Sequence, residues 1–195
     1  MVTERPSTES EPKKSVVKAW QRYYYYFLFV GFLGFVYENL LDPIWYHHPW
    51  QWQGPLHGPW LIIYACGGVV LLALLQKQVK KRLLIGRLNI MPVVVALLIF
   101  VIVGVVEYAG HWLLDTFFDF RPWDYTEKPF NLNGRICLED SLRFVVLGLF
   151  GLYVCMPWID RFLDWIPRRW NIILCSVLIG AFALDVIYSF GIMLL

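Results

Sequence analysis

The sequence predicts an all-α fold, in which about five transmembrane helices form a polytopic bundle. Of the 195 residues, 58% are hydrophobic and only 16% are charged, a balance far from that of soluble proteins. Five apolar runs are each long enough to cross a hydrocarbon core of about 30 Å as a helix. No stretch between them is long enough for a soluble nucleotide-binding domain, and the sequence has no phosphate-loop motif. We therefore expect a single transmembrane domain over residues 20–195.

The first 19 residues have a different composition. They are rich in Glu, Lys, Ser, Thr and Pro and contain no apolar core, so residues 1–19 are expected to form a flexible tail and not a cleaved signal peptide. After this tail, the spans are expected near residues 20–40, 59–75, 92–114, 141–158 and 171–195.

The distribution of cations predicts the orientation. Lys and Arg are concentrated before the first span and in the loops after the second and fourth spans. The opposite loops hold only Arg121, Lys128 and Arg135, mixed with acidic residues. Because cytoplasmic loops retain cations, the N-terminus is predicted to be cytoplasmic and the C-terminus outside. The net charge of +2 gives no support for nucleic-acid binding.

From the positions of the cysteines we expect no disulfide, and from the spacing of the histidines no metal site. No cofactor is expected either. Only Cys137 lies near the outer face, and no Cys-x-x-Cys pair exists. The histidines lie at or near the outer face, but their spacing matches no zinc motif. These histidines are His47, His48, His57 and His111.

Five ionisable residues within the spans are the first candidates for a functional site. A charge in hydrocarbon costs at least about 2.5–3.5 kcal/mol on insertion scales and usually needs a partner. The five lie toward the outer ends of four different spans, so a polar site that opens outward is expected. They are Glu38, Glu107, Asp140, Arg143 and Asp185.

The third span carries a polar stripe. Glu107, Tyr108, His111 and Asp115 recur at helical spacing and fall on one face. In the functional interpretation, Glu107 accepts a proton or hydrogen bond and His111 titrates near physiological pH. In the structural interpretation, Glu107 forms an ion pair with Arg143, and the others are ordinary interfacial residues. Both interpretations remain open at this point.

Arg143 also has two interpretations. Glu139 and Asp140 lie four and three residues before it, so local ion pairs on one helical face would satisfy its charge. If the side chain instead points inward, its guanidinium suits bidentate binding of a carboxylate or phosphate.

Two loops are unusually specific in sequence. Residues 123–138 combine Trp123-Asp124-Tyr125 with an Asn-Gly-Arg sequence in which Asn133 and Arg135 are candidate binding residues. The alternative is a loop whose aromatic residues anchor the interface and whose Asn-Gly pair forms a turn. Residues 52–60 are dense in Gly and Pro, which predicts either a re-entrant segment or a tight surface turn.

Several motifs of the membrane part occur together in one family. With them, the chain resembles bacterial ABC-transporter type IV membrane proteins, a CmpB-like family, and the block at residues 131–138 is the most specific. The resemblance implies a small multi-pass protein of the bacterial plasma or inner membrane, as the permease component of a transport system. The motifs are Gly34-Phe35-Val36-Tyr37-Glu38, Gly54-Pro55-Leu56 with Gly58, Pro59 and Tyr64, Glu107-Tyr108, Trp123-Asp124-Tyr125, and residues 131–138 with Ser141 and Phe144.

Three functional hypotheses follow. The first is a permease-like protein with an outer-facing polar pocket for a small polar or charged solute. The second is a membrane-embedded enzyme acting on a lipid, with Glu107 or Asp124 as base and Arg135 or Arg143 holding phosphate; it ranks lower because no nucleophile is evident and no catalytic residue is predicted. The third is an accessory subunit. The expected partners are membrane lipid, a separate ATPase subunit and a second copy of the chain. The candidate binding residues are Glu38, Glu107, His111, Asp124, Asn133, Arg135, Arg143 and Asp185.

Overall fold

The computed structural model describes residues 19–41, 43–44, 52, 54 and 56–193. Among them are five helical segments long and apolar enough to cross a membrane, which confirms the predicted all-α class. His47 and His48 lie outside the described residues. The elements are α1 (Ala19–Val36), the π-helical η1 (Tyr37–Leu41), α3 (Ile62–Val79), β1 (Leu84–Ile85), β2 (Leu88–Asn89), α4 (Met91–Phe118), β3 (Asn131–Leu132), β4 (Ile136–Cys137), α5 (Leu138–Phe150), the π-helical η2 (Gly151–Cys155), α6 (Met156–Trp165) and α7 (Arg168–Met193).

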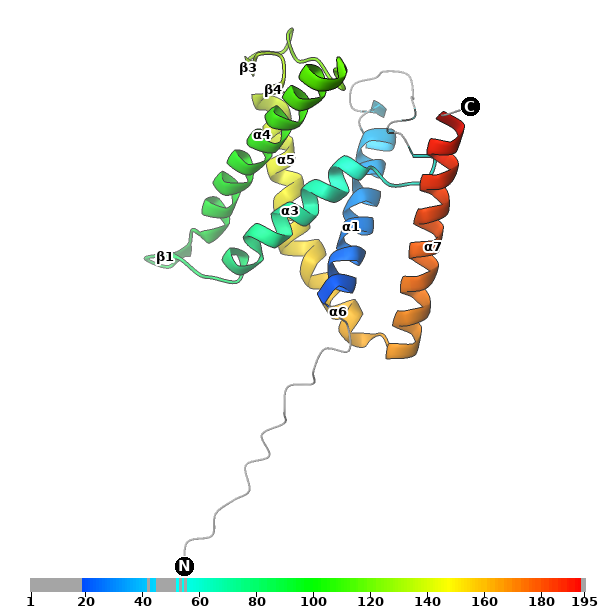
Figure 1. Cartoon of the computed structure of the whole chain (residues 1–195). Coiled ribbons are helices and arrows are strands. Elements are labelled where there is room, and N and C mark those ends of the chain that lie inside the picture. Colours follow the sequence, from blue (N-terminus) through cyan, green and yellow to red (C-terminus); the bar gives the residue numbers. More distant parts are fainter. Residues whose placement is uncertain (1–18, 42, 45–51, 53, 55, 194–195) are drawn as a thin grey trace, which may run out of the picture.

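The helices form a bundle with a hairpin at each end. Helix α3 crosses the bundle obliquely and packs against α1, α4 and η2, while α4 pairs with α5 (Figure 1). Helix α7 stands beside α1 at the edge of the bundle (Figure 1). The β3–β4 hairpin lies at one end, above α4 and α5, and the β1–β2 hairpin lies toward the other end, where α6 also turns into α7 (Figure 1). We call these the upper and lower ends.

The ends of the helices differ from the ends of the apolar runs. The second begins only at Ile62, because Leu61 has an extended backbone and its N–H donates to the Gly31 carbonyl at 3.0 Å. It then continues through Gln76 and Lys77 to Val79, since polar residues of good helix propensity prolong the helix past its apolar part. The fourth runs from Leu138 to Trp165, longer at both ends than the predicted residues 141–158.

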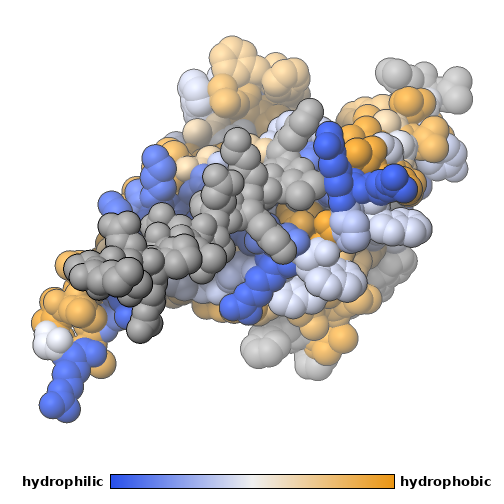
Figure 2. Space-filling model, turned by 90° about the horizontal axis from the view of Figure 1, so that it is seen from below, coloured by the Kyte–Doolittle hydropathy of each residue, from blue (hydrophilic) through white to orange (hydrophobic). Residues whose placement is uncertain are grey.

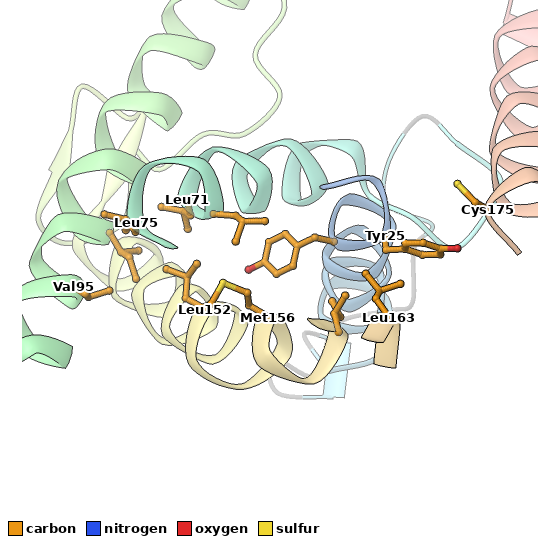
Figure 3. Packing of buried hydrophobic residues seen from close by; sticks show 12 residues of the cluster. Tyr25, Leu71, Leu75, Val95, Leu152, Met156, Leu163 and Cys175 are labelled. Atoms are coloured by element: carbon orange, nitrogen blue, oxygen red, sulfur yellow. The ribbon is translucent and has the colours of Figure 1, made fainter. Parts of the chain in front are cut away.

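A core of buried side chains joins α1, α3, α4 and the α5–α6 helix. Figure 3 shows the aromatic ring of Tyr25 directed toward α7, where Cys175 lies, and Leu71 and Leu75 of α3 facing Leu152. These contacts fix the lower half of the bundle. The cluster consists of Tyr25, Tyr26, Leu71, Leu72, Leu75, Val95, Ile99, Leu152, Met156, Ile159, Leu163 and Cys175.

Helices α1 and α3 approach closely through glycine. A Cβ atom at Gly34 would lie 2.4 Å from Cγ of Tyr64, and one at Gly68 would lie 2.6 Å from Cγ1 of Val30. Neither distance leaves room for a methyl group, so the absence of a side chain lets the two backbones meet. This contact places the Tyr64 ring against the upper half of α1.

Polar contacts tie the lower ends of the helices together. The Arg22 guanidinium on α1 binds Asp160 of α6, with NH2 2.9 Å from Oδ2, and its NH1 donates to Gln76 of α3 at 2.9 Å. On α7, Asn171 is fully buried and its Oδ1 accepts a hydrogen bond from the Tyr25 hydroxyl at 2.9 Å. The start of α7 is therefore attached to α1.

Candidate functional site

The polar stripe of α4 lies under the loop that follows it. Helix α4 ends at Phe118. The next residue, Asp119, has a left-handed backbone (φ 50°) that reverses the chain, and the N–H of Phe120 donates back to the Leu114 carbonyl at 3.2 Å. Residues 119–137, which we call the cap, then return over the upper end of the helix (Figure 1). The cap brings its own polar side chains onto Glu107, Tyr108 and His111.

A tight hairpin gives the cap its shape. Strands β3 and β4 are joined by a turn in which Asn133 and Gly134 both have positive φ, 55° and 67°, and the Arg135 N–H donates to the Leu132 carbonyl at 3.1 Å. This is the type I′ turn that Asn-Gly pairs favour. The N–H of Tyr125 donates to the Gly134 carbonyl at 2.8 Å, so the first half of the cap is held against the hairpin.

Asp124 stabilises the first half of the cap locally. Its carboxylate accepts hydrogen bonds from the Thr126 hydroxyl and, at 2.9 Å, from the Thr126 N–H. These two hydrogen bonds lower the pKa of Asp124 below its ordinary value, and the bond from the hydroxyl has the larger effect. Asp124 therefore stays ionised beside the turn and forms one wall of the space beneath it.

Two contacts join the cap to the buried face of α4. His111 Nε2 donates to the Trp123 carbonyl at 2.9 Å, and since a carbonyl only accepts, Nε2 carries the ring proton. The Tyr125 hydroxyl donates to Oε1 of Glu107 at 3.4 Å. Burial, followed by the negative charge of Glu107, raises the pKa of Tyr125 above its ordinary value, so the phenol remains a donor.

Arg135 links the hairpin to the top of α4. Its NH1 donates to the Tyr108 hydroxyl at 3.2 Å and its NH2 to Asp115 at 3.1 Å. Asn133 donates to the same hydroxyl at 2.9 Å, and Arg121 pairs with Asp115 at 2.8 Å. Two cations thus share one carboxylate at the rim of the cap.

Three polar atoms under the cap have no hydrogen-bond partner among the described residues. They are Oε2 of Glu107, Nδ1 of His111 and Nε of Arg135. Glu107 is only 9% exposed and His111 only 3%, so a buried site of this kind normally holds a ligand or water. A cavity of about 90 Å³ adjoins it. The cavity is lined by His111, Asp115, Arg121, Asp124, Thr126, Asn133, Gly134 and Arg135.

Asp140 holds a second group of charges at the start of α5. Its carboxylate accepts from Lys128 Nζ at 2.7 Å, Arg143 NH1 at 2.8 Å and the Cys137 thiol at 2.9 Å. Burial alone would lower the pKa of Lys128, but the Asp140 carboxylate raises it overall. Burial and the Asp140 hydrogen bond raise the pKa of Cys137 to about 11. Arg143 also pairs with Glu139, so the local pairing anticipated from the sequence is present.

Glu38 and Asp185 lie on other elements. Glu38 belongs to η1 and accepts a hydrogen bond from Tyr64, whose ring lies 5.7 Å from that of Phe144 on α5. Asp185 of α7 accepts from the Gly58 N–H at 2.8 Å and from Trp60 Nε1 at 2.9 Å. Asp185 thus fixes the loop before α3 to α7.

The structure therefore brings together some of the predicted site residues. Those that meet beneath or within the cap are Glu107, His111, Asp124, Asn133 and Arg135. Arg143 adjoins this group through Asp140, whereas Asp185 serves the separate contact with α7. Sequence reasoning did not single out Tyr64, Tyr125 and Lys128 as partners of the buried carboxylates. The only signal was that Tyr64 and Tyr125 belong to the same set of motifs as Glu38 and Glu107.

Replacing Gly134 with alanine should destabilise the cap more than the same change in the other hairpin. A Cβ at Gly134 would lie 2.6 Å from the Thr126 hydroxyl and 3.0 Å from the Asp124 carboxylate, whereas one at Gly86 meets nothing within 4 Å. Both positions have positive φ, so alanine costs about 1–2 kcal/mol of backbone strain in both variants. Only Gly134→Ala adds a steric clash. Thermal unfolding in detergent should give the lower melting temperature for G134A; equal values for G134A and G86A would contradict the packing of the cap.

Comparison with known proteins identifies one matching family. A family model described as "Putative ABC-transporter type IV" matches residues 25–190, which include the cap, the η1 turn and the Asp185 contact. No curated protein and no solved structure matches the chain.

Proposed function

Because the chain belongs to the ABC-transporter type IV family, we propose that it is the permease subunit of a transport system. In this proposal, the polar pocket beneath the cap receives a small polar or charged solute from the outer side. The sequence lacks a phosphate-loop motif, so a separate ATPase subunit would supply the energy.

One observation carries the proposal: the buried, incompletely satisfied polar pair of α4. Glu107 and His111 are one helical turn apart, and each has a buried polar atom without a partner among the described residues. Leaving such groups unpaired costs free energy, so their retention suggests a transient partner. Nε2 of His111 carries a proton; when Nδ1 carries none it offers an acceptor, while Arg135 Nε offers a donor. A solute that carries both donors and acceptors suits this set.

The size of the cavity limits what enters without movement. A cavity of about 90 Å³ has room for a few water molecules. Larger solutes would require the cap to move. The Tyr125–Glu107 hydrogen bond, at 3.4 Å, is longer than a strong hydrogen bond and is the contact expected to open first. Such movement at the outer end is one half of an alternating-access cycle.

Native mass spectrometry in a mild detergent tests the composition of the proposed system. The protein would be extracted from its own membrane, so that partners and small ligands are retained. A complex with an ATPase subunit supports the permease assignment. A lone chain or a homo-oligomer that holds a lipid would overturn it and favour action on a lipid substrate.

Glu107→Gln tests the role of the buried carboxylate that adjoins the cavity. The amide keeps the size of the side chain but replaces a carboxylate oxygen with a donor. A hydrogen bond to a charged group contributes about 1.5–3 kcal/mol. We therefore expect retention of the co-purified solute to fall at least tenfold. Glu127→Gln is the matched control, because Glu127 is exposed on the cap. Both variants should retain the wild-type oligomeric state. Equal solute retention in the two variants would remove Glu107 from the binding site.

A further inference from the structure

The β1–β2 hairpin between α3 and α4 is an ordered projection. Its two strands pair across a turn that begins at Gly86 (φ 62°), as expected for a two-residue hairpin loop of type II′. The Asn89 side-chain oxygen accepts hydrogen bonds from the N–H groups of Leu83 at 3.1 Å and Met91 at 3.2 Å. These contacts fix the base of the hairpin to the start of α4.

The hairpin exposes large apolar side chains. Leu84 is 62% exposed, Ile85 65% and Leu88 73%. A two-stranded hairpin is at best marginally stable in water, and the apolar side chains of this one are not buried against other described residues. Its side chains therefore require an apolar environment from outside the chain.

Cations flank these apolar residues in the sequence, and the same stretch of sequence contains no carboxylate. The sequence contains no Asp or Glu between Asp42 and Glu107. Within the described part of the chain, the cations of this segment form no ion pair with a carboxylate. Among the described residues, the positive charge of this segment is thus not balanced by an ion pair. The cations are Lys77, Lys80, Lys81, Arg82 and Arg87.

The position of the hairpin fits a lipid surface better than an aqueous partner. It connects two membrane-spanning helices and extends sideways from the bundle, while the turn from α6 to α7 reaches further down (Figure 1). Seen from below, hydrophobic and hydrophilic side chains lie together at the left edge of the molecule, where this projection ends (Figure 2). A docking site for a large protein at the lower end would be expected to project downward.

We propose that the β1–β2 hairpin is an interfacial anchor that binds anionic phospholipid. Leu84, Ile85 and Leu88 insert at the boundary between headgroups and acyl chains, and the flanking cations bind the phosphates of anionic headgroups. Apolar insertion and electrostatic attraction reinforce each other, since neither a few apolar side chains nor a few cations bind a membrane firmly. This site is at the opposite end of the molecule from the cap and does not depend on the transport proposal.

Limited trypsin digestion in nanodiscs tests the anchor. Discs of phosphatidylcholine alone would be compared with discs that also contain phosphatidylglycerol, and the rate of cleavage after Arg87 would be divided by the rate after Arg169, which is exposed at the start of α7. We expect the normalised rate after Arg87 to fall roughly tenfold in the anionic discs, because several cations contact the surface. The two kinds of disc differ only in their lipid, so a difference in protection between them reports on the lipid.

Two variants separate the contributions of the two residue types. The triple change Leu84→Ser, Ile85→Ser and Leu88→Ser keeps the cations and should abolish protection, as should Lys80→Gln with Lys81→Gln. The matched control is Leu132→Ser, a similarly exposed leucine (54%) of the upper hairpin, which should leave protection unchanged. Equal cleavage in both kinds of disc, full protection in phosphatidylcholine alone, or protection that survives both variants would each overturn the proposal.

Discussion

Replacing Asp140 with alanine should lower the apparent melting temperature of the purified protein by roughly 4–12 °C. The Asp140 side chain is only 12% exposed and is the shared partner of Lys128 and Arg143, whose side chains are 36% and 25% exposed. Its loss leaves two partly buried cations without this carboxylate and removes the acceptor of the Cys137 thiol. We expect a cost of about 2–3 kcal/mol, below the value for a fully buried pair because Lys128 is partly solvated. A change of 1 kcal/mol corresponds to about 2–4 °C for a chain of this size.

The neighbouring acidic residue provides the control. Glu139 also pairs with Arg143, but its side chain is 47% exposed, so Glu139→Ala should cost at most about 1 kcal/mol. Asp140→Asn keeps one acceptor oxygen and should fall between the two. Similar melting temperatures for D140A and E139A would show that Asp140 does not hold the cap to α5.

Replacing Asp185 with alanine should release the loop before α3. The two carboxylate oxygens accept one hydrogen bond each from the Gly58 N–H and Trp60 Nε1, at 2.8 and 2.9 Å. A hydrogen bond to a charged group contributes about 1.5–3 kcal/mol, so amide exchange in residues 56–61 should accelerate roughly 10- to 100-fold. Hydrogen–deuterium exchange in detergent measures this change directly. Exchange in the lower half of α1 should stay the same.

Graded variants test whether this effect comes from the hydrogen bonds. Asp185→Asn retains an oxygen that accepts from the Gly58 N–H. Its NH2 group, however, would face Trp60 Nε1, and both groups are donors. We therefore expect roughly half of the acceleration in amide exchange. Ser189→Ala removes the hydroxyl that receives the His57 N–H at 3.0 Å and donates to Asp185 Oδ1 at 3.3 Å, but it keeps the carboxylate's hydrogen bonds with Gly58 and Trp60, so it should have the smallest effect. An order in which S189A exceeds D185A would contradict the proposed role of the carboxylate.

The number and class of the helices followed from hydrophobic runs alone, whereas the helix ends did not. The fourth segment illustrates the reason. It continues past the predicted residue 158 to Trp165, through Asp160. A charged residue usually marks the end of a membrane-spanning segment, because a charge in hydrocarbon is costly. Asp160, however, is paired with Arg22 of the first helix. Arg22 is distant from Asp160 in sequence, so hydrophobic periodicity, which uses only neighbouring residues, does not predict this pair.

The candidate site was predictable along one helix and not across several. Glu107 and His111 share a face because the helical repeat is 3.6 residues, and that part of the prediction needed no tertiary structure. Their actual partners, Tyr125 and the Trp123 carbonyl, lie on a loop whose return depends on the reversal at Asp119. Asp185 pairs with a backbone N–H and an indole, and a search for complementary charges does not find such partners.

The attachment of α7 has a consequence for how the protein is assembled. Asn171 binds the Tyr25 hydroxyl near one end of the helix, and Asp185 binds Gly58 and Trp60 near the other. All of these partners precede α7 by more than a hundred residues in the chain, so they are synthesised first. Helix α7 is apolar enough to insert by itself, and its polar groups then find partners already in place. Synthesis order therefore protects the last helix from exposing an unpaired carboxylate to lipid for long.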